Sequence, residues 1–297
     1  MAAMTPPSDR CVFPYDLSRR PANRVCVYRA SAAQKAPVTR ANGVSSPGRD
    51  PGEFAEYAPQ SFTWHPGNVT DDTEVPAPSG APLPAPMTVA QIKEAEVVAL
   101  SHAPEDALMD RAARAVARVV RDELTKAGRL VPNSNIVVLA GSGRNGGDAL
   151  LAGALLAADG ADVTGVEVTV TAHARGREAL DAAGGRPLNA VAESGIRAAD
   201  AVLAEADLVI DGIAGLGGEA GLRAPADHLV GRIPTDAIIV SVDLPSGLSA
   251  DSGEITGSHV TAHVTVAFTA PSWCLVTAPA SEAAGRIVVA DVGVDVL

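Results

Sequence analysis

Aromatic residues are scarce in this chain, which has two Trp, three Tyr and four Phe among 297 residues. Seven of these nine lie before residue 65, so that only Phe268 and Trp273 remain for the rest of the chain. That remainder is rich in Ala, Val, Leu and Gly. The composition therefore predicts a folded part whose core is built from aliphatic side chains.

Cysteine is also rare. The three cysteines, Cys11, Cys26 and Cys274, form no spacing typical of a metal site, and two of them lie close to the N-terminus. A disulfide framework or a zinc site is therefore not expected. This usage fits a reducing compartment, and we predict a cytoplasmic protein.

The chain lacks both a long apolar run and a run of basic residues. No apolar segment approaches the length that spans a bilayer. The formal net charge is −12 and the sequence pI is about 4.9. These absences argue against nucleic acid or a membrane as a partner. Any phosphate group that the protein binds must be held by local amide groups rather than by a general positive field.

Residues 1–86 differ from the rest in composition. They hold 14 of the 22 prolines and equal numbers of basic and acidic residues, eight of each. The Pro-rich run at 75–86 is typical of a linker. We predict a disordered N-terminal extension over 1–86 and one folded domain over 87–297. Two other readings stay open: a transit peptide within the first 49 residues, which are mostly basic, or translation that starts at Met87.

From Met87 onwards the pattern first predicts helices and then alternates between strands and helices. Alternation of this kind is typical of parallel βαβ units. We therefore expect an α/β fold, a three-layer Rossmann-like sandwich with a mostly parallel central sheet and helices on both faces. The expected helices are 88–100, 104–127, 147–159, 175–184, 194–205 and 221–232, and the expected strands are 135–140, 162–171, 207–212, 237–243, 263–268 and 286–291.

Three of the expected strands end in a carboxylate and a glycine-containing turn. These segments are 141–148, 211–219 and 243–248. In an open parallel sheet, ligands bind beyond the carboxyl ends of the strands. We therefore expect Asp148, Asp211 and Asp243 to gather at one edge of the sheet.

The first of these segments is Gly141-Ser-Gly-Arg-Asn-Gly-Gly-Asp148. A glycine-rich turn between a strand and a helix exposes backbone N–H groups that bind anions. The segment satisfies the dinucleotide pattern G-x-G-x-x-G but lacks the Lys-Ser/Thr of a Walker A loop. Simpler readings are a tight turn without ligand, with Asp148 as a helix cap and Asn145 in a left-handed conformation.

Together these segments resemble the NAD(P)H-hydrate epimerase family, the YjeF N-terminal domain. The family patterns are G-x-G-N-N-G-G-D-G, D-A-x-F-G-T-G-L and D-I-P-S-G-L-x-A-D-x-G. Shorter family patterns are L-M-E-x-A-G, T-F-x-x-P and D-I-G-I. The matching segments of this chain are 141–149, 211–218 and 243–253 for the long patterns, and 108–113, 267–271 and 291–294 for the short ones.

The resemblance implies a substrate and a reaction. The substrate is NADH or NADPH hydrated at C6 of the nicotinamide ring, and the reaction interconverts its R and S epimers. A dehydratase specific for the S epimer then restores the coenzyme. No dehydratase domain follows in this sequence, so we expect that activity on another chain. Formation of a homodimer is left open.

The resemblance also implies roles for individual residues. Asp243 is the expected catalytic acid/base, and a potassium ion is expected as cofactor. Its expected ligands are Asn145, Asp211 and Ser246. The expected substrate-binding residues are Arg144, Asn145, Gly146, Gly147, Asp148, Gly215, Leu216, Gly217, Gly218, Glu219 and Asp243.

The chemistry fits such a site. Inversion of C6 without a redox step requires loss of its hydroxyl group, formation of an iminium by the ring nitrogen, and return of water from the other face. A carboxyl group protonates the departing oxygen and later accepts a proton from water. A nearby anion stabilises the transient cation.

The chain departs from the family pattern within the loops. Arg144 replaces an Asn, and Arg144 is expected either to bind a phosphate group or to block the pocket. Where the family often has a catalytic Lys, this chain has His173, Arg175 and Arg177. The remaining replacements are Ala149 for Gly, Ala214 for Phe, Leu216 for Thr and Gly218 for Leu.

Two interpretations compete with the epimerase, and the departures at Arg144 and Leu216 favour the first of them. The first is a non-catalytic binding or scaffold module that keeps the fold of the family. The second is an ordinary dehydrogenase, which requires an acidic ribose ligand about 20 residues after the glycines. Glu167 lies somewhat late for that role, so the dehydrogenase ranks last.

Overall fold

The computed structural model describes residues 27–29 and 84–294. The strands are β1 (Val27–Arg29), β2 (Asn135–Ala140), β3 (Asp162–Glu167), β4 (Arg186–Asn189), β5 (Leu208–Gly212), β6 (Ile238–Val242), β7 (Val264–Phe268) and β8 (Arg286–Ala290). The helices are α1 (Val89–Leu100), α2 (Glu105–Lys126), α3 (Arg144–Ala158), α4 (Ala174–Ala182), α5 (Glu193–Leu203), α6 (Ala226–Val230), α7 (Trp273–Val276) and the 3-10 helix η2 (Ala280–Ala283).

The strands form one sheet in the order β1-β8-β7-β6-β5-β2-β3-β4. Seven strands, β2 to β8, pair in parallel, and β1 pairs antiparallel with β8. The chain proceeds outwards from β2 through β3 to β4, then returns to the other side of β2 with β5. Loops that leave β2 and β5 therefore diverge in opposite directions and open a crevice at their carboxyl ends.

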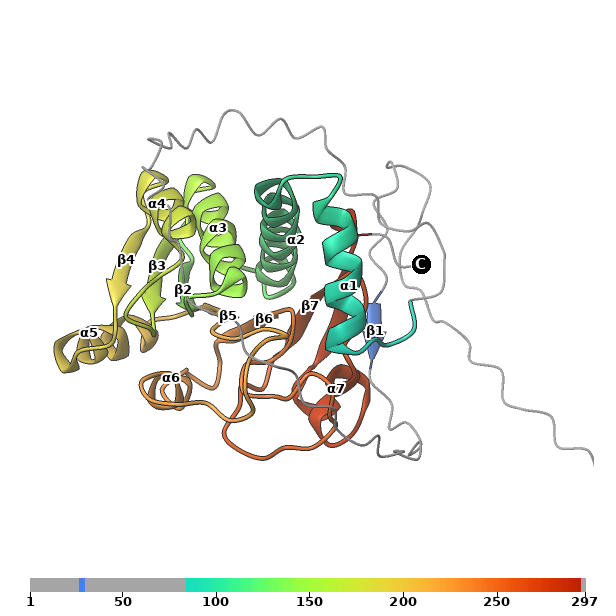
Figure 1. The fold of residues 1–297 in the computed structure, drawn as a ribbon. Helices are drawn as coiled ribbons and strands as arrows, with labels where there is room; N and C mark the ends of the chain where they lie inside the picture. The colour runs from blue at the N-terminus through green and yellow to red at the C-terminus, as the bar shows by residue number, and fades with distance from the viewer. Residues whose placement is uncertain (1–26, 30–83, 295–297) are drawn as a thin grey trace, which may run out of the picture.

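Helices cover both faces of the sheet (Figure 1). On one face α2, α3 and α4 pack against alternate strand residues such as Val138 and Ile210. On the other face α5 and α6 pack against Val137, Leu139 and Val209, and α7 and η2 pack against Ile287. Because both faces are covered, the central strands are apolar throughout instead of alternating. The expected three-layer α/β fold is confirmed.

Local sequence signals set several helix ends as expected. Thr88 caps α1, and a capping box joins it to Gln91. Gly128 follows α2 with φ of 72°, a left-handed conformation that glycine adopts without steric cost. Both helices therefore end within one or two residues of the predicted bounds.

Other bounds were predicted wrongly. The strand β4 was missed, because its Pro187 and the preceding glycines argue against a strand; an edge strand tolerates proline. The helix expected over 221–232 is only α6, since Gly221 and Pro225 interrupt its first half. The strand expected over 162–171 ends at Glu167.

The predicted extension over 1–86 lies mostly outside the described residues, and its disorder and the boundary at 87 stay predictions. Within it, the structure describes β1 beside β8, a pairing that the sequence did not indicate. Among the described residues, no helix combines the length and apolar character needed to cross a membrane.

Candidate active site

The first glycine-rich segment forms a short turn over 141–143 and then the first residues of α3. The helix begins at Arg144, three residues earlier than expected, and Gly143 is an N-cap without a side-chain hydrogen bond. Asn145 therefore has helical geometry rather than a left-handed one, and Asp148 is not the cap. Both simpler readings of these residues were wrong. The uncapped amides at the start of α3 remain free to face an anion.

Different neighbouring groups exclude a side chain at three of the glycines of this segment. A Cβ on Gly146 would overlap the carbonyl oxygen of Gly141, and a Cβ on Gly141 would overlap that of Ile213. A Cβ on Gly147 would lie 2.7 Å from the ring of His173. Gly141 thus lets the ends of β2 and β5 pack closely, Gly146 lets α3 begin against Gly141, and Gly147 makes room for His173. Gly143 has open space at its Cβ position, so glycine there suits both an N-cap and the close approach of a ligand.

Asp243 lies directly after β6, with φ of 71°. This left-handed conformation is unusual for a residue other than glycine and occurs at functional sites. Its Oδ2 accepts a hydrogen bond of 2.9 Å from the Leu216 amide. Burial raises the pKa of Asp243 to about 6, although the Leu216 hydrogen bond acts in the opposite direction. A carboxyl group with this pKa exchanges protons readily near neutral pH.

Gly215 brings the second loop against Asp243. A Cβ on Gly215 would lie 2.7 Å from Oδ2 of Asp243 and 3.2 Å from Oδ1 of Asn145. Glycine at this position therefore allows the backbone to pass beside both side chains. The ends of β2, β5 and β6 meet here, as expected from their position at one edge of the sheet.

Asp211 lies at the end of β5 and is fully buried. Its Oδ1 accepts hydrogen bonds from the Ser246 hydroxyl at 2.5 Å and the Ile213 amide at 3.3 Å. Its Oδ2 accepts from the Ser241 hydroxyl at 2.7 Å and the Ser246 amide at 2.9 Å. Burial raises the pKa of Asp211, while these hydrogen bonds lower it. No ion pair to Asp211 exists within the described part of the chain.

Asp148 lies one turn into α3 and is 8% exposed. Its Oδ1 is buried without a hydrogen-bond partner. Burial raises the pKa of Asp148 well above its usual range, and the negative charge of Asp243 raises it further. Arg144 and Arg175 act in the opposite direction. A buried carboxylate without a partner is costly, so this side chain needs an explanation beyond the fold.

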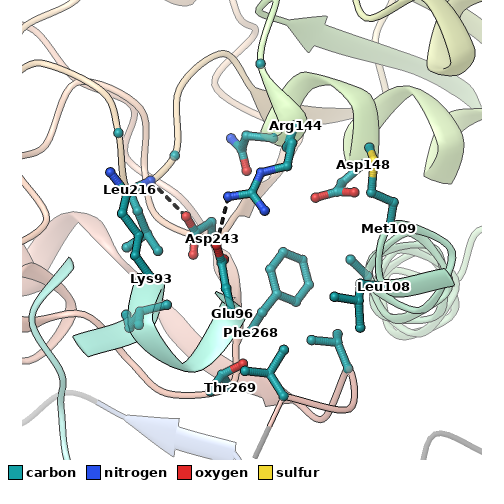
Figure 2. A pocket seen from close by; sticks show the side chains of 18 of the residues that line it. Lys93, Glu96, Leu108, Met109, Arg144, Asp148, Leu216, Asp243, Phe268 and Thr269 are labelled. Carbon is teal, nitrogen blue, oxygen red and sulfur yellow. Dashed lines mark hydrogen bonds and ion pairs between the residues drawn. The ribbon is translucent and has the colours of Figure 1, made fainter. Parts of the chain in front are cut away.

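Arg144 is held by acidic residues of the first two helices. Its Nη2 donates to Glu96 of α1 at 2.7 Å, and its Nε lies 3.8 Å from Glu105 of α2. Figure 2 shows the guanidinium reaching across the pocket from α3 towards Glu96. Arg144 lines the pocket, and whether it binds a phosphate group or blocks the pocket stays a prediction; a phosphate group would have to compete with Glu96 for it.

These side chains surround a cavity of about 450 Å³. Four carboxylates and two cationic side chains line it. The apolar part of the wall includes Leu108, Met109 and Phe268 (Figure 2). The lining residues are Ile92, Lys93, Glu96, Glu105, Leu108, Met109, Ala112, Gly143, Arg144, Asn145, Asp148, Ile213, Ala214, Gly215, Leu216, Gly217, Gly218, Asp243, Phe268, Thr269, Val292 and Val294.

Most of the expected substrate-binding residues thus meet at one cavity. Gly146 and Gly147 lie behind its wall, where they support the loop packing. Glu219 is outside it and pairs with Arg223 at the surface. Asp211 and Ser246 are fully buried and do not line the cavity.

The basic segment after β3 does not replace the catalytic Lys of the family. His173 caps α4 by accepting a hydrogen bond from the Gly176 amide, and burial lowers its pKa. Arg175 pairs with Asp110, and Arg177 lies 3.4 Å from Glu167. None of these residues lines the cavity.

Sequence reasoning missed the contribution of α1. Lys93 and Glu96 line the cavity, although no motif contains them. Leu108 and Phe268 lie in two of the short motifs, so their positions could have been inferred from the resemblance. Lys93 has no hydrogen bond or ion pair to any described residue, and Figure 2 shows it extending from α1 towards Leu216.

A family profile described as YjeF-related protein N-terminus matches residues 105–274. The chain belongs to this family. The matched range contains all three polar strand ends, whereas α1 lies before it. The YjeF-related domain therefore carries both the glycine-rich segments and the Asp243 loop.

Curated relatives agree with this membership. An NAD(P)H-hydrate epimerase of Clavibacter sepedonicus is 35% identical over 215 residues, which cover 69% of this chain and 89% of that protein. A bifunctional NAD(P)H-hydrate repair enzyme Nnr of Mycobacterium tuberculosis (strain CDC 1551 / Oshkosh) is 36% identical over 209 residues. That match covers 70% of this chain and 41% of the relative, so this YjeF-related chain spans less than half the length of the bifunctional protein.

A solved structure supports the fold. The crystal structure of the yeast protein ynu0 (YNL200c) superposes with a TM-score of 0.55 and 21% sequence identity. The match covers 64% of this chain and 83% of the yeast chain. At this identity the likeness shows the Rossmann-like fold of the YjeF-related domain alone.

Proposed function

We propose that this chain is an NAD(P)H-hydrate epimerase, which interconverts the R and S epimers of hydrated NADH and NADPH. The observation that carries the proposal is Asp243, a carboxyl group with a pKa of about 6 on the wall of a cavity beside two glycine-rich segments. The names of the relatives from Clavibacter and Mycobacterium support the substrate class.

The cavity offers what the reaction requires of the protein. The uncapped N-terminus of α3 and the open Cβ position of Gly143 suit the diphosphate of the nucleotide. Leu108, Met109 and Phe268 give an apolar surface for the ring. Asp243 protonates the hydroxyl group that leaves C6, and the acidic lining stabilises the iminium that remains. Water then adds to the opposite face of C6.

We further propose that a potassium ion binds at Asn145, Asp211 and Ser246. These residues offer oxygen atoms to a hard cation, and the buried charge of Asp211 has no basic partner among the described residues. The Nδ2 atom of Asn145 is buried and unpartnered, while its Oδ1 lies near Gly215. The ion would neutralise Asp211 and order the loop carbonyls.

The proposed partner is a dehydratase specific for the S epimer, since the bifunctional relative is named as a repair enzyme. Homodimer formation and a cytoplasmic location stay predictions. A non-catalytic binding module is the second candidate, and the Arg144–Glu96 pair within the cavity is the observation that favours it.

The decisive experiment mixes the purified full chain with both epimers of hydrated NADH and an S-specific dehydratase. Without the chain, the S fraction is converted quickly and the R fraction only at the spontaneous rate. With it, we expect the R fraction to follow rapidly. Recovery of the R fraction at no more than the spontaneous rate would rule out the epimerase and favour the binding module.

Replacing Asn145 with alanine tests the potassium site. We expect weaker nucleotide binding and loss of any dependence of the rate on potassium. The measurement is a titration with potassium chloride against sodium chloride at constant ionic strength. An unchanged response to potassium in the variant would remove Asn145 from the proposed ligand set.

A further inference from the structure

We infer that Asp148 is a second acid/base group, which acts on the opposite face of the hydrated nicotinamide ring from Asp243. This inference rests on the proposed epimerase function. It gives each face of C6 its own carboxyl group. The resemblance placed Asp148 among the substrate-binding residues and gave it no chemical role.

The surroundings of Asp148 favour a role in chemistry over a role in the fold. Asp211 shows how this domain satisfies a buried carboxylate, since each of its oxygens accepts two hydrogen bonds. Asp148 is also buried and lines the cavity, but its Oδ1 has no partner. Asp148 therefore combines a place in the cavity lining with a buried oxygen that no described residue satisfies, and such an oxygen calls for an explanation beyond the fold.

The two carboxyl groups approach the cavity from different elements. Asp243 follows β6, and Asp148 projects from α3 beside Met109. In Figure 2 their carboxylates stand on either side of the Arg144 guanidinium. In this inference the nicotinamide ring lies in the cavity between these two residues, so that each face of the ring meets one carboxyl group.

Charged groups on several elements act on the ionisation of Asp148. Glu96 of α1 and Asp243 disfavour its ionised form, whereas Arg144 of α3 and Arg175 of α4 favour it. Burial is the largest cause that raises the pKa of Asp148, and it also raises that of Asp243. We assign the neutral form to one group and the ionised form to the other, because the negative charge of Asp243 opposes ionisation of Asp148.

Inversion at C6 requires one neutral and one ionised carboxyl group. The neutral carboxyl group donates its proton to the C6 hydroxyl, the C6–O bond breaks, and water leaves. The ring nitrogen lone pair forms the double bond to C6 and gives the iminium. A new water molecule attacks C6 from the other face while the ionised carboxylate accepts its proton. The two groups have then exchanged protonation states, and the same pair catalyses the reverse direction.

The test follows oxygen exchange separately from inversion. Each epimer of hydrated NADPH is incubated in ¹⁸O-labelled water with the full-length wild type, Asp148→Asn or Asp243→Asn. Chromatography gives the epimer and mass spectrometry gives the label. The wild type is expected to invert both epimers with incorporation of ¹⁸O.

Each variant should lose inversion by about 100-fold or more, the usual contribution of a general acid or base. Each variant should still incorporate ¹⁸O into one of the two epimers without inverting it. The epimer that incorporates ¹⁸O should differ between the two variants. Such exchange requires only the carboxyl group on the face that carries the hydroxyl. Asp122→Asn, an exposed substitution on α2, is the matched control and should behave as the wild type.

Two results would overturn the inference: inversion by Asp148→Asn at the wild-type rate, or a parallel fall of inversion and of exchange in both epimers. The second result would show a structural role. If Asp148→Asn does not fold, Asp148→Ala with added formate is used instead, because formate can occupy the space of the missing carboxyl group. Recovery of inversion on addition of formate supports the inference, and no recovery opposes it. A wild type that neither inverts nor exchanges would instead refute the proposed function itself.

Discussion

Replacing Asp243 with asparagine is expected to stabilise the folded domain above pH 6, although it removes the acid/base group. Burial raises the pKa of Asp243 from its ordinary value of 3.8 to about 6 in the folded chain. A group whose pKa is raised by folding contributes stability below its unfolded pKa, and this contribution is lost as the pH rises through the folded pKa. Asparagine remains neutral, so the variant escapes this loss.

The size of the effect follows from the two pKa values. At 1.36 kcal/mol per pH unit, a rise from 3.8 to about 6 corresponds to about 3 kcal/mol as an upper limit. Solvent reaches part of the Asp243 side chain, which reduces this figure to about 1.5–3 kcal/mol. For a domain of this size each kcal/mol shifts Tm by roughly 2 to 4 °C, so we expect a shift of roughly 3 to 12 °C. Asparagine also tolerates the left-handed conformation of residue 243.

Thermal unfolding between pH 4 and pH 8 measures this prediction. The Tm difference between Asp243→Asn and the wild type should be near zero at pH 4, grow between pH 4 and pH 6, and level off above pH 7. Asp122→Asn makes the same substitution at an exposed position of α2 and should show no such rise. A Tm difference that does not change with pH, or that decreases as the pH rises, would refute the reasoning.

Two further predictions concern glycine packing and the charges of the pocket. Gly146→Ala should lower the free energy of unfolding by about 1–3 kcal/mol, because the added Cβ overlaps the Gly141 carbonyl. In the control Gly217→Ala the added Cβ meets open space, so its Tm should equal that of the wild type. The same Tm in the two variants would contradict this prediction. Arg144→Asn removes a cation from the pocket and should weaken binding of NADPH roughly tenfold. Glu96→Gln releases the Arg144 guanidinium from its ion pair and should strengthen binding severalfold. Fluorescence titration measures the NADPH affinity of both variants. If the two substitutions change the affinity in the same direction, Glu96 and the nucleotide do not compete for Arg144.

The sheet and the position of the site could be predicted because both depend on local patterns. Apolar runs such as Ile136–Ala140 are typical of buried parallel strands, and the carboxyl ends of such strands share one edge. The convergence of Asp211 and Asp243 follows from this rule without knowledge of any distance. The exposed edge was harder, since β4 contains Pro187 and has little apolar character.

The side chains that complete the cavity could not be predicted in this way. Glu96 and Lys93 reach the site because α1 packs beside α2, a tertiary contact that leaves no spacing in the sequence. The state of Asp148 likewise depends on burial and on the neighbouring charge of Asp243. Sequence patterns therefore predicted at which edge of the sheet the cavity lies, whereas the charged side chains contributed by α1 depend on tertiary packing.

The walls of the cavity come from the first helix and from the last described residues, Ile92 and Val294 among them. A chain emerging from the ribosome therefore cannot assemble this cavity until nearly all of the domain has been synthesised. A bound nucleotide would hold the two ends of the domain together and would slow local opening at both of them. Hydrogen exchange should consequently show protection by ligand in α1 and after β8, far along the chain from the glycine-rich segments.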